Sequence, residues 1–416
     1  MQHLIIGAGP AGVIAAETLR QTDPEAGITL IGAEPAPPYS RMAIPYILAG
    51  NIDESGSYLR ESQNHFDDLN IQLLQQRVTR VDSAAGEVVL NDGSHHAYDK
   101  LLIATGSTPA APPVPGIDSA NVHSCWTLED AREIVNHAKS GANVVLIGAG
   151  FIGCIILESL MARGVNLTVI EAGDRMVPRM MNDKAGAILK QWCIDKGVNI
   201  LTSCSVQSIV AGGSAMEVTT DKGDPLAADL VIYATGVHSN IDFLQGSGVE
   251  TDRGILVNDE MESSVAGIYA AGDVAQALDF STGQRHVHAI QPTAADHGRI
   301  AALNMAGVGC KHQGSVNMNV LDTLGLISCS FGLWMGVEGG DAAERCNAEE
   351  SKYINLQFDG DILVGACSVG LTQHVGVIHG LIASRTRLGE WKARLLDDPL
   401  SIMEAYIAST QELGNL

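Results

Sequence analysis

The sequence predicts an α/β protein with two parallel-sheet domains and a third, α+β domain at the C-terminal end. Two glycine-rich turns indicate the first two domains, because GAGPAG at 7–12 and GAGFIG at 148–153 each follow an apolar strand. A change of pattern near residue 314 indicates the third, since LGLISCSFGLW, YINLQF and ILVGACSV read as successive strands before a helical end. A chain of 416 residues is also long for a single hydrophobic core.

The first domain opens with a strand at His3–Ile6, the glycine turn, a helix to about Gln21 and a strand at Ile28–Ile31. The first glycine permits a tight turn, the second lets the backbone approach a pyrophosphate, and the third lets the helix pack on the strand. An acid at the end of the second strand has the spacing of a ribose ligand. These features predict a dinucleotide site made by Gly7, Gly9, Pro10, Ala11, Gly12 and Glu34.

The same arrangement recurs between about Asn143 and Glu171, and the triplet ATG at 104–106 recurs at 234–236, each time after an apolar strand. This repetition indicates a duplicated architecture. It predicts a second dinucleotide site, formed by Gly148, Gly150, Phe151, Ile152, Gly153, Glu171 and Gly236. A carboxylate in this place repels a 2′-phosphate and favours NAD over NADP, but Arg175 close behind it leaves the preference open.

Between these motifs, the stretch PAPPYSRMAIPYILAG is too rich in proline to begin as regular structure, and we expect a loop over the first nucleotide. The segment YDKLLIATGSTP predicts an apolar strand that ends in a turn of small residues. Four prolines at 109, 112, 113 and 115 then mark a linker.

Composition narrows the choice of partners and location. A net charge of −23 argues against nucleic-acid binding, which needs clustered Lys and Arg. The N-terminus leads straight into a strand without a targeting pattern, so we expect a cytoplasmic protein, and the uncharged runs 140–157 and 362–384 suit a buried core better than a membrane span. Eight cysteines without a CxxC pair give no sign of a metal site.

The chain has 18% charged and 46% hydrophobic residues, which is a low ratio of charged to hydrophobic residues. Extensive subunit contact and a large buried core explain this ratio equally well.

The motifs GAGPAG, Glu34, ATGSTP, GAGFIG, Glu171, ATGVHSN and GIYAAGD together resemble the pyridine nucleotide-disulfide oxidoreductase superfamily over nearly the whole chain. The resemblance implies two Rossmann-like domains, of which the first binds FAD and the second NAD(H), with the NAD domain inserted in the FAD domain. The implied boundaries are 1–112 and 241–313 for the FAD domain, 113–240 for the NAD domain and 314–416 for a C-terminal α+β interface domain.

The same resemblance implies further FAD contacts. It places Asp273 on the ribityl chain and the start of a helix, Pro292 and Thr293, at the pyrimidine edge of the flavin, where a helix N-terminus stabilises negative charge. The remaining cofactor contacts that we expect are Val78, Ala104, Thr105, Gly106 and Gly272.

A redox disulfide is missing, although the superfamily is named after one. No cysteine precedes Cys125, and Met42 in MAIPY stands where one branch carries its single cysteine; a thioether cannot form a mixed disulfide. The stretch PPYSRMAIPYILAG instead resembles the loops of rubredoxin and ferredoxin reductases and of the flavin part of nitrite reductase. In that branch Arg41 would lie near the isoalloxazine, where it would act as a catalytic residue by favouring the reduced flavin; a salt bridge within the loop is the other interpretation.

Three hypotheses of function follow. The leading one is an FAD-dependent oxidoreductase that exchanges electrons between NAD(H) and an electron-carrier protein or an iron–sulfur partner subunit, such as one of an oxoacid or aldehyde oxidoreductase complex, as a homodimer or hetero-oligomer. The second is an NADH-dependent disulfide, persulfide or peroxide reductase that uses one of the C-terminal cysteines Cys329, Cys346 and Cys367. The third is a non-enzymatic redox sensor. His286 and His288 suit packing near the flavin better than a metal site or proton relay.

Overall fold

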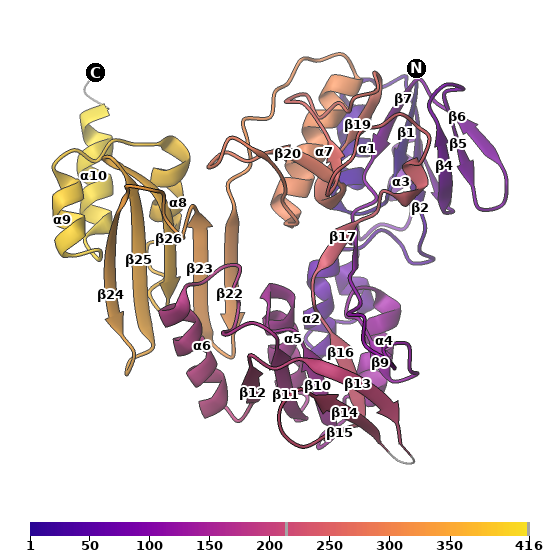
Figure 1. Ribbon diagram of the computed structural model, residues 1–416. Coiled ribbons are helices and arrows are strands. Elements are labelled where there is room, and N and C mark those ends of the chain that lie inside the picture. The colour runs from indigo at the N-terminus through magenta and orange to yellow at the C-terminus, as the bar shows by residue number, and fades with distance from the viewer. Residues whose placement is uncertain (213–214, 414–416) are drawn as a thin grey trace. The chain divides into compact units, whose positions relative to one another are not determined.

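The computed structural model describes residues 1–212 and 215–413 (Figure 1). The described chain forms two compact units. The first comprises Met1–Pro109, Trp126–Leu128 and Val237–Ser315, and the second comprises Ala110–Cys125, Glu129–Gly236 and the chain from Val316 onward. The domain boundaries expected from the sequence stay a prediction.

A five-stranded parallel sheet forms the centre of the first unit, with strand order β19-β7-β1-β2-β3. The strands at its centre are buried along most of their length, as is usual in parallel sheets. Two helices, α1 (Pro10–Thr22) and α7 (Gln291–Met305), pack against each other beside this sheet. The strands are β1 (Gln2–Ile6), β2 (Gly27–Gly32), β3 (Ile71–Gln75), β7 (Lys100–Ile103) and β19 (Ile268–Ala270).

Shorter elements complete the first unit. The proline-rich stretch begins irregularly, as predicted, and then forms a 3-10 turn, η1 (Arg41–Ala43), and the helix α2 (Ile44–Leu48). The other elements are η2 (Glu54–Ser57), α3 (His65–Asp68), β4 (Val78–Asp82), β5 (Glu87–Leu90), β6 (His95–Ala97), β8 (Ser107–Pro109), β17 (Val237–Ser239), η3 (Asp242–Leu244), β18 (Ile255–Leu256), η4 (Gly272–Val274), β20 (Ala275–Leu278) and β21 (Arg285–Val287).

The second unit repeats the parallel sheet with strand order β12-β11-β10-β16-β9. The register repeats as well: the Gly7 amide donates to Ile31 O at 2.7 Å, and the Gly148 amide donates to Ile170 O at 2.8 Å. The predicted duplication is therefore confirmed. The elements are β9 (Val122–His123), α4 (Leu128–His137), β10 (Asn143–Ile147), α5 (Phe151–Ala162), β11 (Asn166–Glu171), α6 (Asp183–Asp195), β12 (Asn199–Thr202), β13 (Val206–Ala211), β14 (Met216–Thr220), β15 (Leu226–Ala228) and β16 (Leu230–Tyr233).

The C-terminal part of the second unit is an antiparallel sheet with order β22-β23-β26-β25-β24, whose core also includes side chains of the following helices. This confirms the predicted α+β character. Asn182, which caps α6, donates to the hydroxyl of Tyr353 on β25 at 2.5 Å. The elements are β22 (Met318–Thr323), β23 (Leu326–Gly332), β24 (Asp341–Asn347), β25 (Lys352–Asp359), β26 (Ile362–Val369), α8 (Val375–Ser384), α9 (Trp391–Asp397) and α10 (Ile402–Leu413).

Candidate functional site

Of the three glycines in the first glycine turn, only Gly9 has room for a side chain. Gly7 has φ +112°, and a Cβ placed there would lie 2.1 Å from Ala104 O. A Cβ at Gly12, in the first turn of α1, would lie 1.9 Å from Gly7 O. A Cβ at Gly9 would meet nothing within 4 Å. The first and third glycines are therefore required by backbone packing, whereas the middle one faces open space at the N-terminus of α1, where Pro10 and Ala11 form the first helical residues.

The second glycine turn has the same geometry. A Cβ at Gly148 would lie 2.5 Å from Ala234 O and one at Gly153 would lie 2.1 Å from Gly148 O, while one at Gly150 would meet nothing within 4 Å. Gly150 precedes α5, which begins with Phe151 and Ile152. Neither α1 nor α5 has a side chain that caps its N-terminus. Open space beside the positive end of a helix fits the pyrophosphate of a dinucleotide.

The two acids at the strand ends have different surroundings. Glu171, the last residue of β11, accepts hydrogen bonds from the Ala149 and Gly173 amides, both at 2.7 Å. Its carboxylate is thereby fixed beside the glycine turn. Arg175, which left the NAD preference open, lies 2.7 Å from Asp183 and 2.8 Å from Asp174. These two carboxylates compensate its charge, and this favours NAD.

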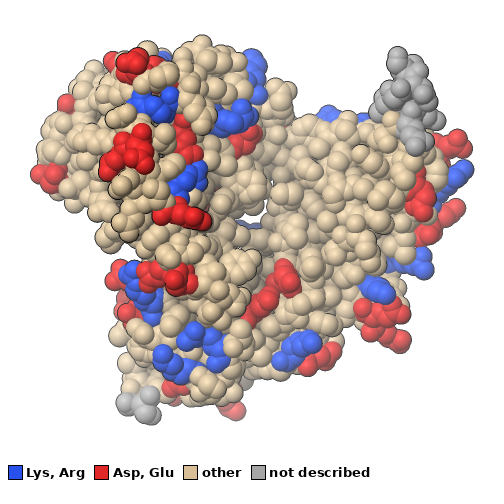
Figure 2. Space-filling view, turned by 180° about the vertical axis from the view of Figure 1, so that it is seen from behind, with Lys and Arg blue, Asp and Glu red and all other residues tan. Residues whose placement is uncertain are grey.

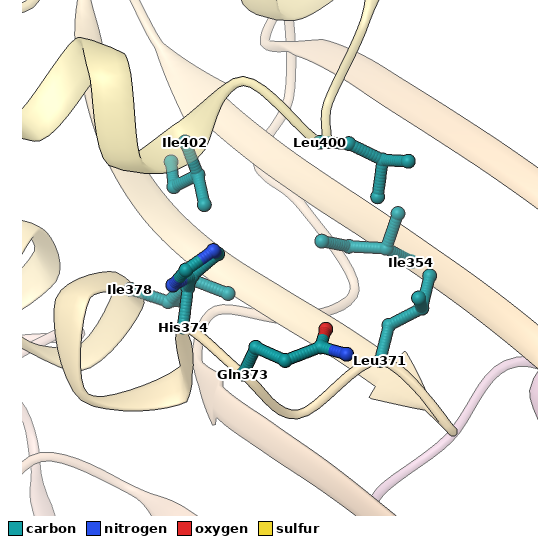
Figure 3. A pocket seen from close by; sticks show the side chains of 7 residues that line it. All are labelled: Ile354, Leu371, Gln373, His374, Ile378, Leu400 and Ile402. Carbon is teal, nitrogen blue, oxygen red and sulfur yellow. The ribbon is translucent and has the colours of Figure 1, made fainter.

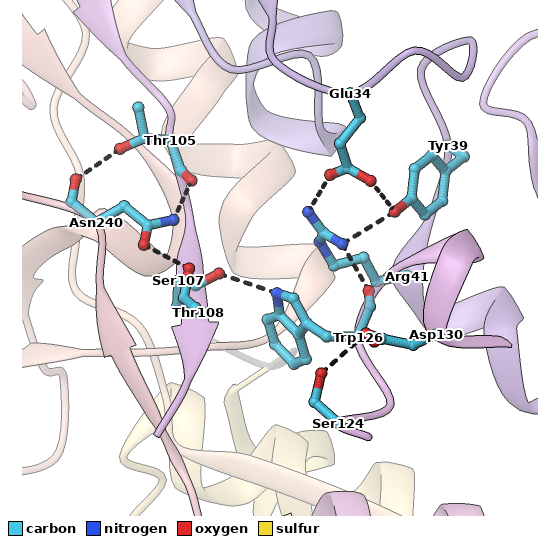
Figure 4. Close-up of polar contacts among 10 residues, drawn as sticks. All are labelled: Glu34, Tyr39, Arg41, Thr105, Ser107, Thr108, Ser124, Trp126, Asp130 and Asn240. Carbon is cyan, nitrogen blue, oxygen red and sulfur yellow. Dashed lines mark hydrogen bonds and ion pairs between the residues drawn. The ribbon is translucent and has the colours of Figure 1, made fainter. Parts of the chain in front are cut away.

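Glu34, beyond the end of β2, belongs to a polar cluster with the proline-rich stretch (Figure 4). Its Oε1 lies 2.5 Å from Arg41 Nη2, and its Oε2 accepts a hydrogen bond from the Tyr39 hydroxyl at 2.5 Å. Arg41 Nη1 donates to the Tyr39 hydroxyl at 2.9 Å and to Trp126 O at 2.5 Å. Burial and the neighbouring Glu34 raise the pKa of Tyr39, which stays a neutral donor. Of the two interpretations of Arg41, the salt bridge is present; the flavin role stays a proposal.

A second polar group lies at the end of β19. Asp273 Oδ2 accepts a hydrogen bond from the Ser107 hydroxyl at 2.8 Å, and the Ser239 hydroxyl donates to Asp273 O at 2.7 Å. Burial raises the pKa of Asp273, although the bond from Ser107 acts against this. A Cβ at Gly272, with φ +77°, would lie 3.4 Å from Ala11 and from Ala294, so η4 passes closely between α1 and α7.

The other expected contacts lie on separate elements of the two units. In the first unit, Thr105 and Gly106 follow β7 and are bonded to Asn240: Thr105 Oγ1 donates to Asn240 O at 3.0 Å and the Asn240 amide donates to Gly106 O at 3.0 Å. The remaining predicted residues are Ala104, buried at the end of β7, Pro292 and Thr293, in the first turn of α7, Gly236, which follows β16 in the second unit, and Val78, buried in β4. Their role in binding a cofactor stays a prediction.

Several residues at this edge were missed from the sequence. Trp126 donates its indole N–H to Ser107 O at 2.9 Å, and the Ser40 hydroxyl donates to Gln291 Oε1 at 2.5 Å. Gly298 lies inside α7, where a Cβ would be 2.3 Å from Ala11 O. Only Gly298 had a signal in the sequence, because glycine in a helix interior is unfavourable unless close packing requires it.

The histidine pair has a partner that the sequence did not indicate. His288 Nε2 lies 3.0 Å from Asp279 Oδ2, with both side chains buried, whereas His286 is exposed on β21. Within residues 1–212 and 215–413, no group of three or more His, Cys, Asp and Glu could hold a metal ion. The packing of His288 near the flavin stays a prediction.

A small hollow beside the C-terminal sheet is lined by none of these residues (Figure 3). Its volume of about 20 Å³ holds little more than one water molecule. Apart from Gln373 and His374 its walls are aliphatic, formed by Ile354, Leu371, Ile378, Leu400 and Ile402. It does not suit a dinucleotide.

The charged side chains and the lengths of the helices describe the surface and the hydrophobicity of the chain. On the face shown in Figure 2, Lys and Arg side chains lie among Asp and Glu side chains, which does not favour nucleic acid. In the part of the chain that the structure describes, every helix is too short or too polar to cross a membrane.

Comparison with known proteins identifies the family. Residues 1–298 match the family of pyridine nucleotide-disulphide oxidoreductases. The epsilon subunit of NADH-dependent phenylglyoxylate dehydrogenase from Aromatoleum evansii is 31% identical over 412 residues, which are 98% of this chain and 98% of that subunit.

Two solved structures are similar over most of the chain. A chain of the covalent complex of putidaredoxin reductase with putidaredoxin has a TM-score of 0.88 and 25% identity, with coverage of 98% of this chain and 99% of that one. The NAD-dependent persulfide reductase from A. fulgidus has a TM-score of 0.86 and 26% identity, with coverage of 94% and 78%. The chain is therefore an oxidoreductase that uses FAD and NAD, and it belongs to the pyridine nucleotide-disulphide oxidoreductase family.

Proposed function

We propose that this protein exchanges electrons between NAD(H) and a one-electron redox centre of a partner protein, without an active-site disulfide. The observation that carries the proposal is Met42, which stands beside Arg41 in η1 with 48% of its surface exposed, where one branch of the family carries its cysteine. Bound FAD would supply the conversion between the two-electron chemistry of nicotinamide and single-electron transfer.

The residues at the two glycine turns would hold the cofactors. The open space beside Gly9 and beside Gly150 would hold the pyrophosphates of the two cofactors. Glu34 and Glu171 would accept hydrogen bonds from the ribose hydroxyls. Arg41 would place a fixed positive charge at the FAD site, although the ion pair with Glu34 compensates part of it. Positioning of the two cofactors, rather than a side-chain acid or base, would contribute most to the rate.

The cysteines give little support to the thiol-based alternative. Burial raises the pKa of Cys329 and of Cys367 to about 12, so neither forms a thiolate readily near neutral pH. Cys346 is exposed on β24. The likeness to a persulfide reductase keeps this second candidate open, with Cys346 as its most accessible thiol.

A permanent subunit role is favoured by the relative from Aromatoleum evansii, which covers 98% of this chain and is one subunit of an NADH-dependent dehydrogenase. Uncharged runs also occupy 312–321 and 362–384, and Figure 2 shows a broad area without charged side chains on the C-terminal part of the second unit. Val320, Ile327 and Met335 expose 48%, 39% and 79% of their surfaces. If these residues belong to one continuous apolar patch, that patch would mark a contact surface. We therefore propose an oxoacid or aldehyde oxidoreductase complex as the setting.

The decisive experiment has two parts. Purification at native expression level should yield this chain with an iron–sulfur partner, identified by mass spectrometry and metal analysis. NADH-dependent reduction of ferricyanide should then survive alkylation of the accessible thiols and the substitution Cys346→Ser. A stable, fully active chain alone would contradict the subunit role, and activity lost on alkylation and in Cys346→Ser would favour the thiol mechanism. Slow turnover with every acceptor would favour a redox sensor.

A further inference from the structure

Trp126 is far from the first glycine turn in sequence, yet the segment Trp126–Leu128 belongs to the first unit. Its side chain and its backbone carbonyl both form hydrogen bonds within this unit. Its indole N–H donates to Ser107 O at 2.9 Å, and its carbonyl accepts a hydrogen bond from Arg41 Nη1 at 2.5 Å (Figure 4).

These two contacts connect Trp126 to the two acids of the first site. On one side, the Ser107 hydroxyl donates to Asp273 Oδ2 at 2.8 Å. On the other, Arg41 Nη2 lies 2.5 Å from Glu34 Oε1. Glu34 follows β2 and Asp273 follows β19, and these strands are three steps apart in the sheet, or about 14 Å at the usual strand spacing. The chain of contacts therefore crosses most of the carboxyl edge of the sheet.

The ring of Trp126 adds to the bond at its carbonyl. The Arg41 guanidinium lies 5.5 Å from the centroid of the Trp126 ring and 5.5 Å from that of the Tyr39 ring. A cation held between two aromatic rings, a carboxylate and a carbonyl has few other orientations. Replacement of the indole would weaken this restraint by removing one of the two rings beside Arg41 and would also remove the hydrogen bond to Ser107.

We propose that Trp126 is a positioning residue for FAD: it orders Arg41 and Ser107, and through them Glu34 and Asp273, before the cofactor binds. The inference rests on the proposed FAD site. A site that is ordered in advance does not lose binding energy to the ordering of its side chains, so FAD affinity depends on a residue that need not touch the cofactor.

The test is a titration of the apo-protein with FAD, followed by flavin fluorescence, for the wild type and Trp126→Phe. Phenylalanine keeps an aromatic ring but lacks the N–H that reaches Ser107. We expect the Kd for FAD to rise about five- to tenfold, the size expected for one lost hydrogen bond, while the melting temperature of the apo-protein stays nearly unchanged.

Trp192→Phe is the matched control. Trp192 also donates its indole N–H to a backbone carbonyl, Leu324 O at 3.3 Å, but in the second unit. The Trp192→Phe protein should bind FAD with the same Kd as the wild type. A Trp126→Phe protein that binds FAD as tightly as the wild type would overturn the inference. Wild-type protein without affinity for FAD would instead overturn the proposed function.

A double-mutant cycle with Ser107→Ala keeps the inference testable if Trp126→Phe also lowers the stability of the apo-protein. Ser107→Ala removes the bond to Asp273 but keeps the carbonyl that the indole binds. If both residues act along one chain of contacts, the double variant should lose clearly less FAD affinity than the product of the two single effects. Independent, fully multiplicative losses would contradict the inference.

Discussion

Arg41 and Glu34 form an ion pair, with 2.5 Å between Nη2 and Oε1, so the acid expected at the FAD ribose is also the partner of the arginine expected at the flavin. Both side chains are about one third exposed. The pair therefore links the end of β2 to the proline-rich stretch, and each residue depends on the other for its position.

Arg41→Gln should raise the Kd for FAD at least tenfold, because Glu34 loses its ionic partner and Trp126 O loses a donor. Fluorescence titration of the apo-protein measures this. Tyr39→Phe is the milder control, since it removes one neutral donor from Glu34 and should have a smaller effect. Equal affinity of Arg41→Gln and wild type would show that the pair is a surface salt bridge without a role in binding.

Gly9→Ala should impair FAD binding, whereas Gly12→Ala should lower the stability of the protein. A methyl group at Gly9 meets nothing within 4 Å, so the apo-protein should melt as the wild type does, yet FAD should bind at least tenfold more weakly because the group occupies the space for the pyrophosphate. A methyl group at Gly12 would lie 1.9 Å from Gly7 O and should lower the free energy of unfolding by about 1–3 kcal/mol or more. Thermal melts and FAD titrations of both variants separate the two effects; normal FAD affinity in Gly9→Ala would refute the assignment.

Gly150→Ala should raise the KM for NADH about tenfold or more and leave the FAD content unchanged, since the open space before this glycine belongs to the second turn. Gly376→Ala on α8 is the matched control, because a methyl group there also meets nothing within 4 Å. Steady-state kinetics with ferricyanide and absorbance at the flavin band give both quantities. A loss of FAD from Gly150→Ala, with an unchanged KM for NADH in the fraction that keeps FAD, would mean that the two sites are exchanged.

Glu171→Ser should weaken NADH binding without making NADPH a good substrate. The substitution removes the acceptor for the Ala149 and Gly173 amides as well as the ribose ligand. Arg175, the nearest candidate for a 2′-phosphate, lies against Asp174 and Asp183. We expect kcat/KM for NADH to fall at least tenfold and the value for NADPH to gain only a few-fold. A strong gain for NADPH would show that Arg175 is free to move to the phosphate.

We expect the free energy of unfolding to fall in acid, because the protein contains buried histidines whose pKa is lowered. Burial lowers the pKa of His297 to about 3, so this ring is neutral in the folded protein at pH 6, and burial also lowers the pKa of His3. The unfolded chain binds protons near pH 6.5, so the stability from His297 is present above that value and is lost as the pH falls toward about 3. Each such group lowers the free energy of unfolding by up to about 1.4 kcal/mol per pH unit.

His3→Leu provides the test, because His3 is fully buried and neither ring nitrogen has a hydrogen-bond partner. The variant should lose less stability than the wild type between pH 7 and pH 5 in urea unfolding. An unchanged pH dependence would mean that His3 is protonated in the folded protein or contacts water there.

The sequence alone was sufficient to predict both glycine turns, the acid after β2, the acid at the end of β11, the two parallel sheets and the α+β character of the C-terminal part. These are local features: backbone sterics at Gly7, Gly12, Gly148 and Gly153 dictate the residue type, and alternation of apolar strands and helices dictates the sheets. The absence of a cysteine near Met42 could also be seen in the sequence.

The side chains that meet at the edge of the first sheet could not be predicted from the sequence and are known from the folded structure. Trp126 reaches Ser107 and Arg41 across 19 and 85 positions of sequence, and Gly298 is fixed by the backbone of Ala11. The burial of Cys329 and Cys367, which raises the pKa of both thiols, also depends on the packed sheet. Such contacts arise from the packing of distant segments, and no local propensity encodes them, because the free energy that selects them is gained only when the sheets and helices have assembled.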